Sequence, residues 1–194
     1  MKYKKIIRQR MKTKRRQLTD HQQKFAAMSI WLQATRQPFF TNSQKIAFYM
    51  AIQGELDPLP IIQTSLRLGK KAFLPIVDSS THKLKFAPYQ PNMPMVKNQY
   101  GIWEPESTPK DLISIHTLDL VFVPLVAFDK YGNRLGMGKG YYDRAFQNLK
   151  DNKKPTRVGL AYHFQKIQAV PTSKQDVKMH AVVTEKKIYS PSKK

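Results

Sequence analysis

Apolar positions follow two periods along the chain, one typical of buried strands and one typical of amphipathic helices. Strands are expected over residues 45–50, 71–77, 83–87, 118–127, 157–162 and 181–184. Helices are expected over residues 2–18, between Thr19 and Pro38, and over 58–68 and 141–149. Because strands and helices alternate, the pattern favours an α/β fold with a mostly parallel sheet and helices on both faces.

The second helix has a clear start and an apolar stripe. Thr19 and Gln22 have the spacing of a capping box, and a proline ends the segment. Phe25, Met28 and Leu32 lie near one helical face, so we expect them to be its buried stripe.

Neither repeats nor linkers divide the chain, and residues 1–194 are expected to form one domain. The strand over residues 83–87 follows a turn and is expected to be antiparallel. Polar connecting segments are expected at residues 78–81, 88–98 and 151–155, and a frayed basic tail at 186–194.

The stretch over residues 128–144 is rich in glycine and follows the apolar strand of residues 118–127. Its alternate glycines leave the backbone free to curve closely around a ligand. They lead directly into the helix of residues 141–149, whose first N–H groups and dipole favour an anion. Arg134 and Lys139 add positive charge, so the sequence predicts a phosphate site in a strand-to-helix turn.

Asp143 lies in the first turn of that helix, where a carboxylate would repel phosphate unless Mg²⁺ lies between them. The stretch is not a Walker A loop, because neither Ser nor Thr follows Lys139. It is also a poor dinucleotide fingerprint, since no acidic residue follows about 20 positions on. From the glycines alone, a tight turn with a solvated lysine is an equal alternative.

The first predicted helix, residues 2–18, is strongly basic. Lys4 and Arg8 are four residues apart and share one face, which Lys12 and Arg15 or Arg16 continue. From this pattern alone, a solvated basic surface is the favoured interpretation.

The composition is that of a globular chain with a large basic excess. Of 194 residues 41% are hydrophobic, and 34 basic residues against 13 acidic ones give a net charge of +21. Such a charge favours polyanionic partners, either a nucleic acid or a phosphate-rich substrate. The chain has no cysteine, no apolar run long enough to span a membrane and no signal core, so we expect a cytoplasmic protein.

The run Phe-Asp-x-x-Gly-Asn-Arg-Leu-Gly-x-Gly-Lys-Gly-Tyr-Tyr-Asp-Arg over residues 128–144 closely resembles the signature of the 5-formyltetrahydrofolate cyclo-ligase family. Three looser motifs come in that family's order along the chain. They are Gly-Glu-Leu-Asp at residues 54–57, Gly-Ile-Trp-Glu-Pro at 101–105, and a late segment that contains Pro171 and Asp176. The resemblance therefore covers nearly the full chain.

That resemblance implies a three-layer α/β fold with a mostly parallel central sheet, similar to the ribose-phosphate isomerase and CoA-transferase group. It implies an ATP- and Mg²⁺-dependent enzyme that converts 5-formyltetrahydrofolate to 5,10-methenyltetrahydrofolate with release of ADP and phosphate. It also implies small-molecule substrates, no membrane and no nucleic acid, and we expect a monomer. A basic nucleic-acid-binding protein with a structural glycine loop is the alternative.

The resemblance also assigns roles to residues of this chain. The catalytic candidates are Arg8, Lys139 and Tyr141. The candidates for ATP are Lys4, Arg8, Arg134, Leu135, Gly136, Met137, Gly138, Lys139, Gly140, Tyr141 and Tyr142. Those for the folate are Met50, Glu55, Trp103 and Tyr141, and those for the metal are Asp143 and Asp176.

Two of these assignments have alternatives. Trp103 is flat enough to stack on a substrate ring, but from the residues alone a core position is equally favoured. The surroundings of Asp176 depart from the family's pattern, because Gln175 replaces a usual His and His180 a usual acid. This departure leaves the role of Asp176 open.

Overall fold

The computed structural model describes residues 2–78, 83–147, 149 and 154–191. Parts of four predicted segments lie outside these ranges: residues 79–81 of the turn at 78–81, residue 148 of the helix at 141–149, residues 151–153 of the loop at 151–155, and residues 192–194 of the tail at 186–194. The helices are α1 (Lys2–Arg16), α2 (Asp20–Thr35), α3 (Pro38–Thr41), α4 (Leu59–Arg67) and α5 (Tyr141–Gln147), with short 3₁₀ turns at Ile115–Thr117 and His163–Gln165. The strands are β1 (Lys45–Ala47), β2 (Lys71–Asp78), β3 (Lys83–Tyr89), β4 (Met95–Lys97), β5 (Trp103–Pro105), β6 (Leu120–Pro124), β7 (Ala127–Phe128), β8 (Arg134–Leu135), β9 (Thr156–Leu160), β10 (Ala181–Val183) and β11 (Ile188–Tyr189).

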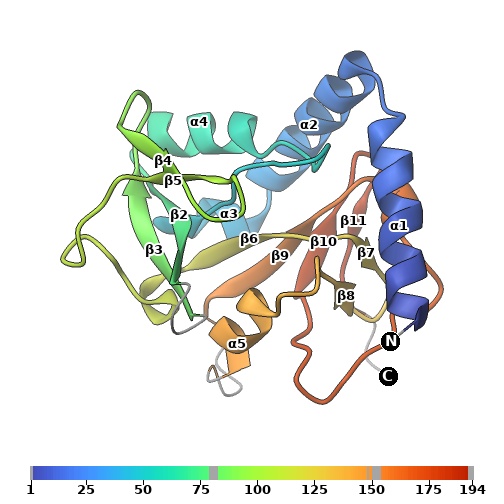
Figure 1. The fold of residues 1–194 in the computed structure, drawn as a ribbon. Helices are drawn as coiled ribbons and strands as arrows, with labels where there is room; N and C mark the ends of the chain where they lie inside the picture. Colours follow the sequence, from blue (N-terminus) through green and yellow to red (C-terminus); the bar gives the residue numbers. More distant parts are fainter. Residues whose placement is uncertain (1, 79–82, 148, 150–153, 192–194) are drawn as a thin grey trace.

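A central sheet in the order β11-β10-β9-β6-β1-β2-β3 organises the chain (Figure 1). Its five inner strands are parallel, whereas β3 and β11 pair antiparallel at the two edges. The predicted mostly parallel sheet is therefore confirmed, as is the antiparallel direction of β3. In parallel sheets, ligands gather beyond the carboxyl ends of the strands.

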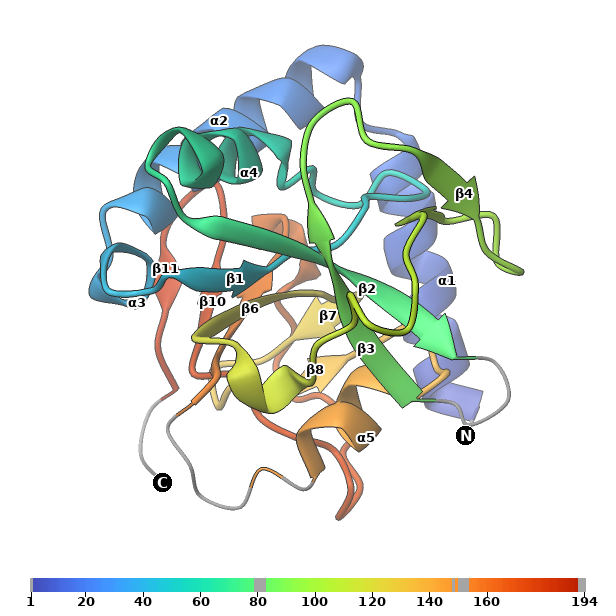
Figure 2. The same cartoon turned by 90° about the vertical axis from the view of Figure 1, so that its left-hand side faces the viewer.

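Helices cover both faces of this sheet, which makes three layers (Figure 2). The helices α2, α3 and α4 pack on one face through a cluster that includes Ile30, Phe40 and Ile61. On the other face, Phe146 of α5 packs against sheet residues such as Val121. The side chains alternate because successive residues of a strand point to opposite faces. The three-layer fold is confirmed, whereas its likeness to the isomerase and transferase group stays a prediction.

The helix α1 lies beside one end of the sheet rather than on either face (Figure 1). Its buried Ile7 and Met11 pack against Val126, Ala127 and Leu135 of a small β7–β8 hairpin. The sequence predicts that the glycine-rich stretch is a direct strand-to-helix turn. This prediction is wrong, because the β7–β8 hairpin comes between β6 and α5.

Three other predicted segments differ in the structure. The first strand ends at Ala47, earlier than predicted, although the following residues stay buried. The segment of residues 88–98 contains β4, which pairs with β5 in a second hairpin. The predicted frayed tail contains β11, because Ile188 and Tyr189 pair with β10 and Tyr189 packs on the ring of Phe128.

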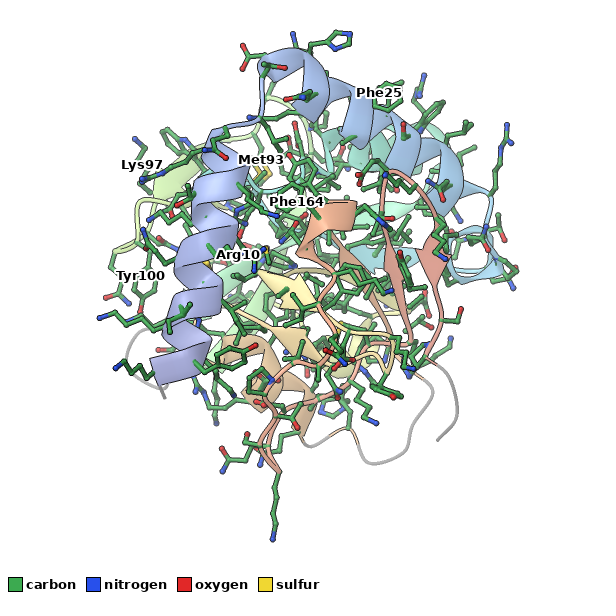
Figure 3. The ribbon with its side chains drawn as sticks, turned by 90° about the vertical axis from the view of Figure 1, so that its right-hand side faces the viewer. Arg10, Phe25, Met93, Lys97, Tyr100 and Phe164 are labelled. Carbon is green, nitrogen blue, oxygen red and sulfur yellow. The ribbon has the colours of Figure 1, made fainter. Side chains whose placement is uncertain are left out.

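The predicted buried stripe of α2 is wrong, although its capping box is present. Phe25, Met28 and Leu32 are 63%, 50% and 42% exposed, and Figure 3 shows Phe25 on the outer side of α2. The buried residues are Ala26, Ala27, Ile30 and Ala34. Small alanines let the helix approach the sheet closely, so the face with less apolar surface is the one that packs.

No helix within the described part of the chain is long and apolar enough to cross a membrane.

Candidate active site

One face of α1 carries three of the basic side chains that the sequence singles out. Lys4, Arg8 and Arg15 follow one another at four and seven residues, which places them on the same side of a helix. Seven residues of helix advance by roughly 10 Å, so Arg8 and Arg15 lie at separate points along the molecule. Arg8 is partly buried, whereas Arg15 is buried.

Arg8 binds the backbone of the glycine loop, which we define as residues 136–140. Its Nε donates a hydrogen bond of 2.9 Å to the carbonyl oxygen of Gly136. Gly138 has a φ of +108°, and a Cβ at that position would lie 3.2 Å from the Arg8 guanidinium. Glycine is thus required at Gly138 both by its backbone conformation and by the approach of the arginine.

Arg134 and Asp143 form an ion pair beneath this loop. The Nη2 of Arg134 donates to Oδ1 of Asp143 at 2.8 Å, and its Nη1 donates to the Val177 carbonyl. Arg134 is buried, and burial lowers its pKa while the adjacent carboxylate opposes that shift. The pair therefore keeps a buried cation neutralised, with the Arg134 guanidinium directed at a carboxylate.

The two predicted metal ligands lie close to each other. The Oδ1 atom of Asp143 also accepts a hydrogen bond of 3.1 Å from the N–H of Val177, the residue that follows Asp176. The Oδ2 atom of Asp176 lies 3.4 Å from Lys4 Nζ and accepts from the Ser173 N–H at 2.7 Å. Asp176 thus contacts the start of α1, and Asp143 contacts the segment that carries Asp176. The described residues contain no group of three or more His, Cys, Asp or Glu that would enclose an ion by themselves.

Lys139 and Tyr141 lie at the exposed rim of the loop. The hydroxyls of Tyr141 and Tyr100 are 2.7 Å apart, and this hydrogen bond raises the pKa of Tyr141. Lys139 Nζ lies 5.5 Å from the centre of the Tyr100 ring. The segment between β4 and β5 is thereby brought beside the loop, and Figure 3 shows Lys97 and Tyr100 on the same side of α1.

A cavity of about 290 Å³ lies at the end of β1. Met50 and Glu55 line it, together with Gln23, Tyr49, Ala51, Gly54, Asp57, Leu59 and Ile62. Glu55 is buried, which raises its pKa, while the charge of Arg15 opposes this shift. Nη1 of Arg15 lies 3.6 Å from Oε1 of Glu55. The cavity therefore combines apolar walls with one buried acid.

Trp103 lies on β5 and is not a core residue, since 47% of its surface is exposed. Lys97 Nζ lies 4.9 Å from the centre of its ring. The lining of the Glu55 cavity, as the described residues define it, does not include Trp103. The structure thus brings together two folate candidates, Met50 and Glu55, and leaves Trp103 on the neighbouring hairpin.

Sequence reasoning did not connect three residues of this region with Glu55. Arg15 is only one of several basic residues in its pattern, and Tyr49 is simply a strand residue. Tyr142 is expected with ATP, whereas its hydroxyl is buried and interacts electrostatically with Glu55. The spacing of Arg15 from Arg8 is a usable signal, but burial at position 15 is not visible in so basic a helix.

Comparisons with known proteins agree with this geometry. The sequence profile of the 5-formyltetrahydrofolate cyclo-ligase family matches residues 1–185. A 5-formyltetrahydrofolate cyclo-ligase of Haemophilus influenzae is 39% identical over 178 residues, or 91% of this chain and 95% of the relative. One of Escherichia coli K12 is 36% identical over 185 residues, or 95% and 99%. The structure of Aquifex aeolicus 5,10-methenyltetrahydrofolate synthetase superposes with a TM-score of 0.82 at 30% identity, and covers 98% of this chain and 94% of that one.

Proposed function

The chain belongs to the 5-formyltetrahydrofolate cyclo-ligase family, and from this premise we propose how its residues divide the reaction between them. The enzyme uses ATP to close 5-formyltetrahydrofolate into 5,10-methenyltetrahydrofolate. The observation that carries the residue assignment is the contact of Arg8 with the backbone of the glycine loop, beside two carboxylates. This contact joins a basic helix to a backbone suited to phosphate.

The chemistry requires activation of a formyl oxygen, which is a poor leaving group. In the proposed sequence, this oxygen attacks the γ-phosphorus of ATP and ADP leaves. N10 of the same folate then attacks the formyl carbon and loses its proton to solvent. The carbon–oxygen bond breaks, phosphate departs with both electrons of that bond, and the methenyl carbon is left bonded to N5 and N10 as a cation. Both bonds form between substrates, so the protein chiefly positions them and stabilises charge.

ATP is proposed to bind between α1 and the glycine loop. Arg8 contacts this loop from α1, Lys4 of the same helix lies beside Asp176, and Lys139 lies at the exposed side of the loop. A planar arginine suits two phosphate oxygens, and a lysine acts as a point charge. The full proposed set is Lys4, Arg8, Arg134, Leu135, Gly136, Met137, Gly138, Lys139, Gly140, Tyr141 and Tyr142, of which Arg8, Lys139 and Tyr141 are catalytic.

Within this set, Arg134 and Tyr142 act from below the loop. Arg134 directs its guanidinium at Asp143, and the hydroxyl of Tyr142 is buried toward Glu55. We infer that Arg134 serves the phosphates by holding this carboxylate in place. Tyr142 in turn supports the boundary between the ATP and folate regions.

The donor set fits Mg²⁺. Among the described residues, the contacts of Asp143 use its Oδ1 and those of Asp176 use its Oδ2, so each carboxylate has a second oxygen to offer. Mg²⁺ commonly takes one or two carboxylates together with substrate phosphates and waters. When bound, the ion would neutralise charge on the phosphates. Lys4, now beside Asp176, would then be released toward the phosphates.

The folate is proposed to bind at the Glu55 cavity and the hairpin beside it. A carboxylate accepts hydrogen bonds from the N–H groups of a pterin edge, and Met50 offers an apolar wall. Trp103 is exposed and flat, so it suits stacking against a ring. Tyr141, at the rim of the glycine loop, lies between the two substrates.

The comparisons do not support the alternative of a nucleic-acid-binding protein, since the named relatives are cyclo-ligases. A cytoplasmic location and a monomeric state stay predictions.

The test is a direct assay. Purified protein is mixed with 5-formyltetrahydrofolate, Mg²⁺ and ATP, and the near-ultraviolet absorbance of the methenyl product is followed. The band should grow only when ATP is present, and it should disappear when EDTA is in excess. A flat trace from a folded protein, as judged by circular dichroism, would contradict the proposed reaction. If the absorbance band still grows in excess EDTA, the reaction does not need Mg²⁺, and the proposed roles of Asp143 and Asp176 as its ligands are wrong.

A further inference from the structure

The described part of the chain holds three buried side-chain atoms without a hydrogen-bond partner, and all belong to residues around Glu55. They are Nε and Nη1 of Arg15 and the hydroxyl of Tyr142. Unpaired buried polar groups are costly and rare, so their gathering at one acid indicates a purpose beyond packing.

The backbone brings Arg15 and Glu55 together. Gln53 and Gly54 have φ values of +50° and +71°, and this left-handed turn directs the next residue inward. A Cβ on Gly54 would lie 3.3 Å from the carbonyl oxygen of Arg15 and 3.4 Å from its Cβ. The turn before Glu55 therefore lies directly against α1, and glycine allows this close approach.

Arg15 supplies the positive charge for Glu55. Among the described residues, no other cation is recorded as acting on that carboxylate, which also accepts a hydrogen bond of 3.4 Å from the Ile52 N–H. The other titratable groups that face this cluster are Tyr49, Tyr142, Tyr162 and Asp57, and beyond them Arg134 acts on Tyr142 and Glu185 on Tyr162. Burial raises the pKa of each of these tyrosines, so they stay neutral and offer no counter-charge.

We propose that Arg15 is a positioning residue for folate recognition, which keeps Glu55 ionised and turned into the cavity while it does not itself touch the substrate. This inference rests on the proposed role of Glu55 as the acceptor for the pterin edge. An ionised carboxylate only accepts hydrogen bonds, whereas a protonated one also donates. The buried arginine thus makes the site selective for a ligand edge rich in N–H donors.

The wider cluster fits this role. The long distance of 3.6 Å from Nη1 of Arg15 to Oε1 of Glu55 leaves the carboxylate able to accept further donors. Tyr49 is fixed by donating from its hydroxyl to the carbonyl oxygen of Leu56 at 2.6 Å, which holds the turn that carries Glu55. Arg15 lies on the same face of α1 as Arg8, so one helix serves both substrates.

The test measures the KM for 5-formyltetrahydrofolate and for ATP between pH 5.5 and 8.5 in four proteins: wild type, Arg15→Met, Arg15→Lys and Glu55→Gln. Loss of Arg15 removes the influence that lowers the pKa of Glu55, so this pKa rises further. The KM for the folate in Arg15→Met should therefore increase as pH falls. The ratio of this KM to that of wild type should approach tenfold for each unit of pKa shift at a pH below both pKa values, and should fall toward one at a pH above both.

Two controls separate positioning from general damage. Arg15→Lys keeps the charge and should return the pH profile toward wild type. The KM for ATP should stay within about twofold of wild type in both Arg15 variants, because ATP is proposed to bind at the Arg8 end. A KM for the folate that rises equally at all pH values, or a parallel loss for ATP, would overturn the inference.

If Arg15→Met does not fold, the double variant Arg15→Met/Glu55→Gln tests the inference instead. It removes both charges together and so leaves no buried carboxylate without its partner. A KM for the folate equal to that of Glu55→Gln means that Arg15 acts through Glu55. A further large increase means that it acts in another way and overturns the inference. If Glu55→Gln itself leaves the KM unchanged, the proposed role of Glu55 fails first, and the inference about Arg15 fails with it.

Discussion

Arg8 and Arg15 lie on the same face of α1, yet their surroundings are opposite. Arg8 is partly exposed and donates to a backbone carbonyl of the glycine loop. Arg15 is buried and lies against the carboxylate of Glu55. The first arginine thus contacts an uncharged backbone group, whereas the second is paired with a carboxylate of the protein.

Under the proposed assignment of the sites, this difference follows from the chemistry of the two substrates. ATP brings several negative charges, and a site with unneutralised cations and free N–H groups attracts it. A pterin edge is neutral and rich in donors, so its site needs an acceptor in an apolar setting, and a buried acceptor needs a counter-charge. In this proposal, basic residues of α1 serve both sites: Arg8 through its exposed positive charge and Arg15 as the buried partner of Glu55.

The largest effect is expected from Arg8→Ala. The loss of one charged donor at the phosphates should lower kcat/KM by about 10²–10³-fold. Stability should fall by only about 1 kcal/mol, because a single hydrogen bond to the Gly136 carbonyl is lost. Steady-state kinetics and urea unfolding measure the two quantities. Activity near wild type would remove Arg8 from the site and with it the contrast between the two arginines.

Asp143→Ala should affect both stability and activity. It leaves the buried Arg134 without its partner at 2.8 Å, which costs about 3–5 kcal/mol. Asp143→Asn is the matched control, because the amide oxygen still accepts from Arg134 while the negative charge is lost. We expect Asn to retain part of the stability, because the hydrogen bond to Arg134 remains while its counter-charge is lost, and to require far more Mg²⁺ for activity. An Asn variant with the wild-type Mg²⁺ dependence would show that this residue is structural only.

Gly138→Ala tests the close approach of Arg8 to the glycine loop. A φ of +108° and a distance of 3.2 Å to the guanidinium mean that a methyl group strains the backbone and displaces the arginine. The expected cost is about 1–3 kcal/mol of stability, together with a higher KM for ATP. Gly136→Ala is the control for stability, since its added Cβ would meet no atom within 4 Å and its φ is not left-handed. Equal unfolding free energies in the two variants would contradict this account.

Much of the fold was predictable from periodicity. The parallel sheet, the order of its elements and the capped start of α2 follow from spacing and caps, which are local signals. The β7–β8 and β4–β5 hairpins were missed because their strands contain only two or three residues. The prediction that Phe25, Met28 and Leu32 are buried was wrong because α2 packs on the sheet through a face rich in alanine. Which face packs depends on the distance between helix and sheet, and the helix's own sequence does not show that distance.

The candidate site likewise has one part that the sequence predicts and one part that only the structure shows. The residues of the glycine loop form one continuous motif, so the sequence alone pointed to them. Glu55 and Arg15 are 40 positions apart, and their pairing depends on how α1 lies against the turn at Gly54. In a helix with many basic residues, the sequence does not show which of them is buried. Only the packed structure distinguishes Arg15 from the others.

The smallest effect is expected from Trp103→Ala on the folate side. The indole is 47% exposed and is covered on one face by Lys97, so its loss should change stability by less than about 0.5 kcal/mol. Loss of stacking should raise the KM for 5-formyltetrahydrofolate by several fold, corresponding to about 0.5–1.5 kcal/mol, and leave the KM for ATP unchanged. Trp103→Phe keeps a flat ring and should recover most of the affinity. If Ala raises the KM for ATP instead, Trp103 belongs with the glycine loop and not with Glu55, and the boundary between the two substrates lies elsewhere.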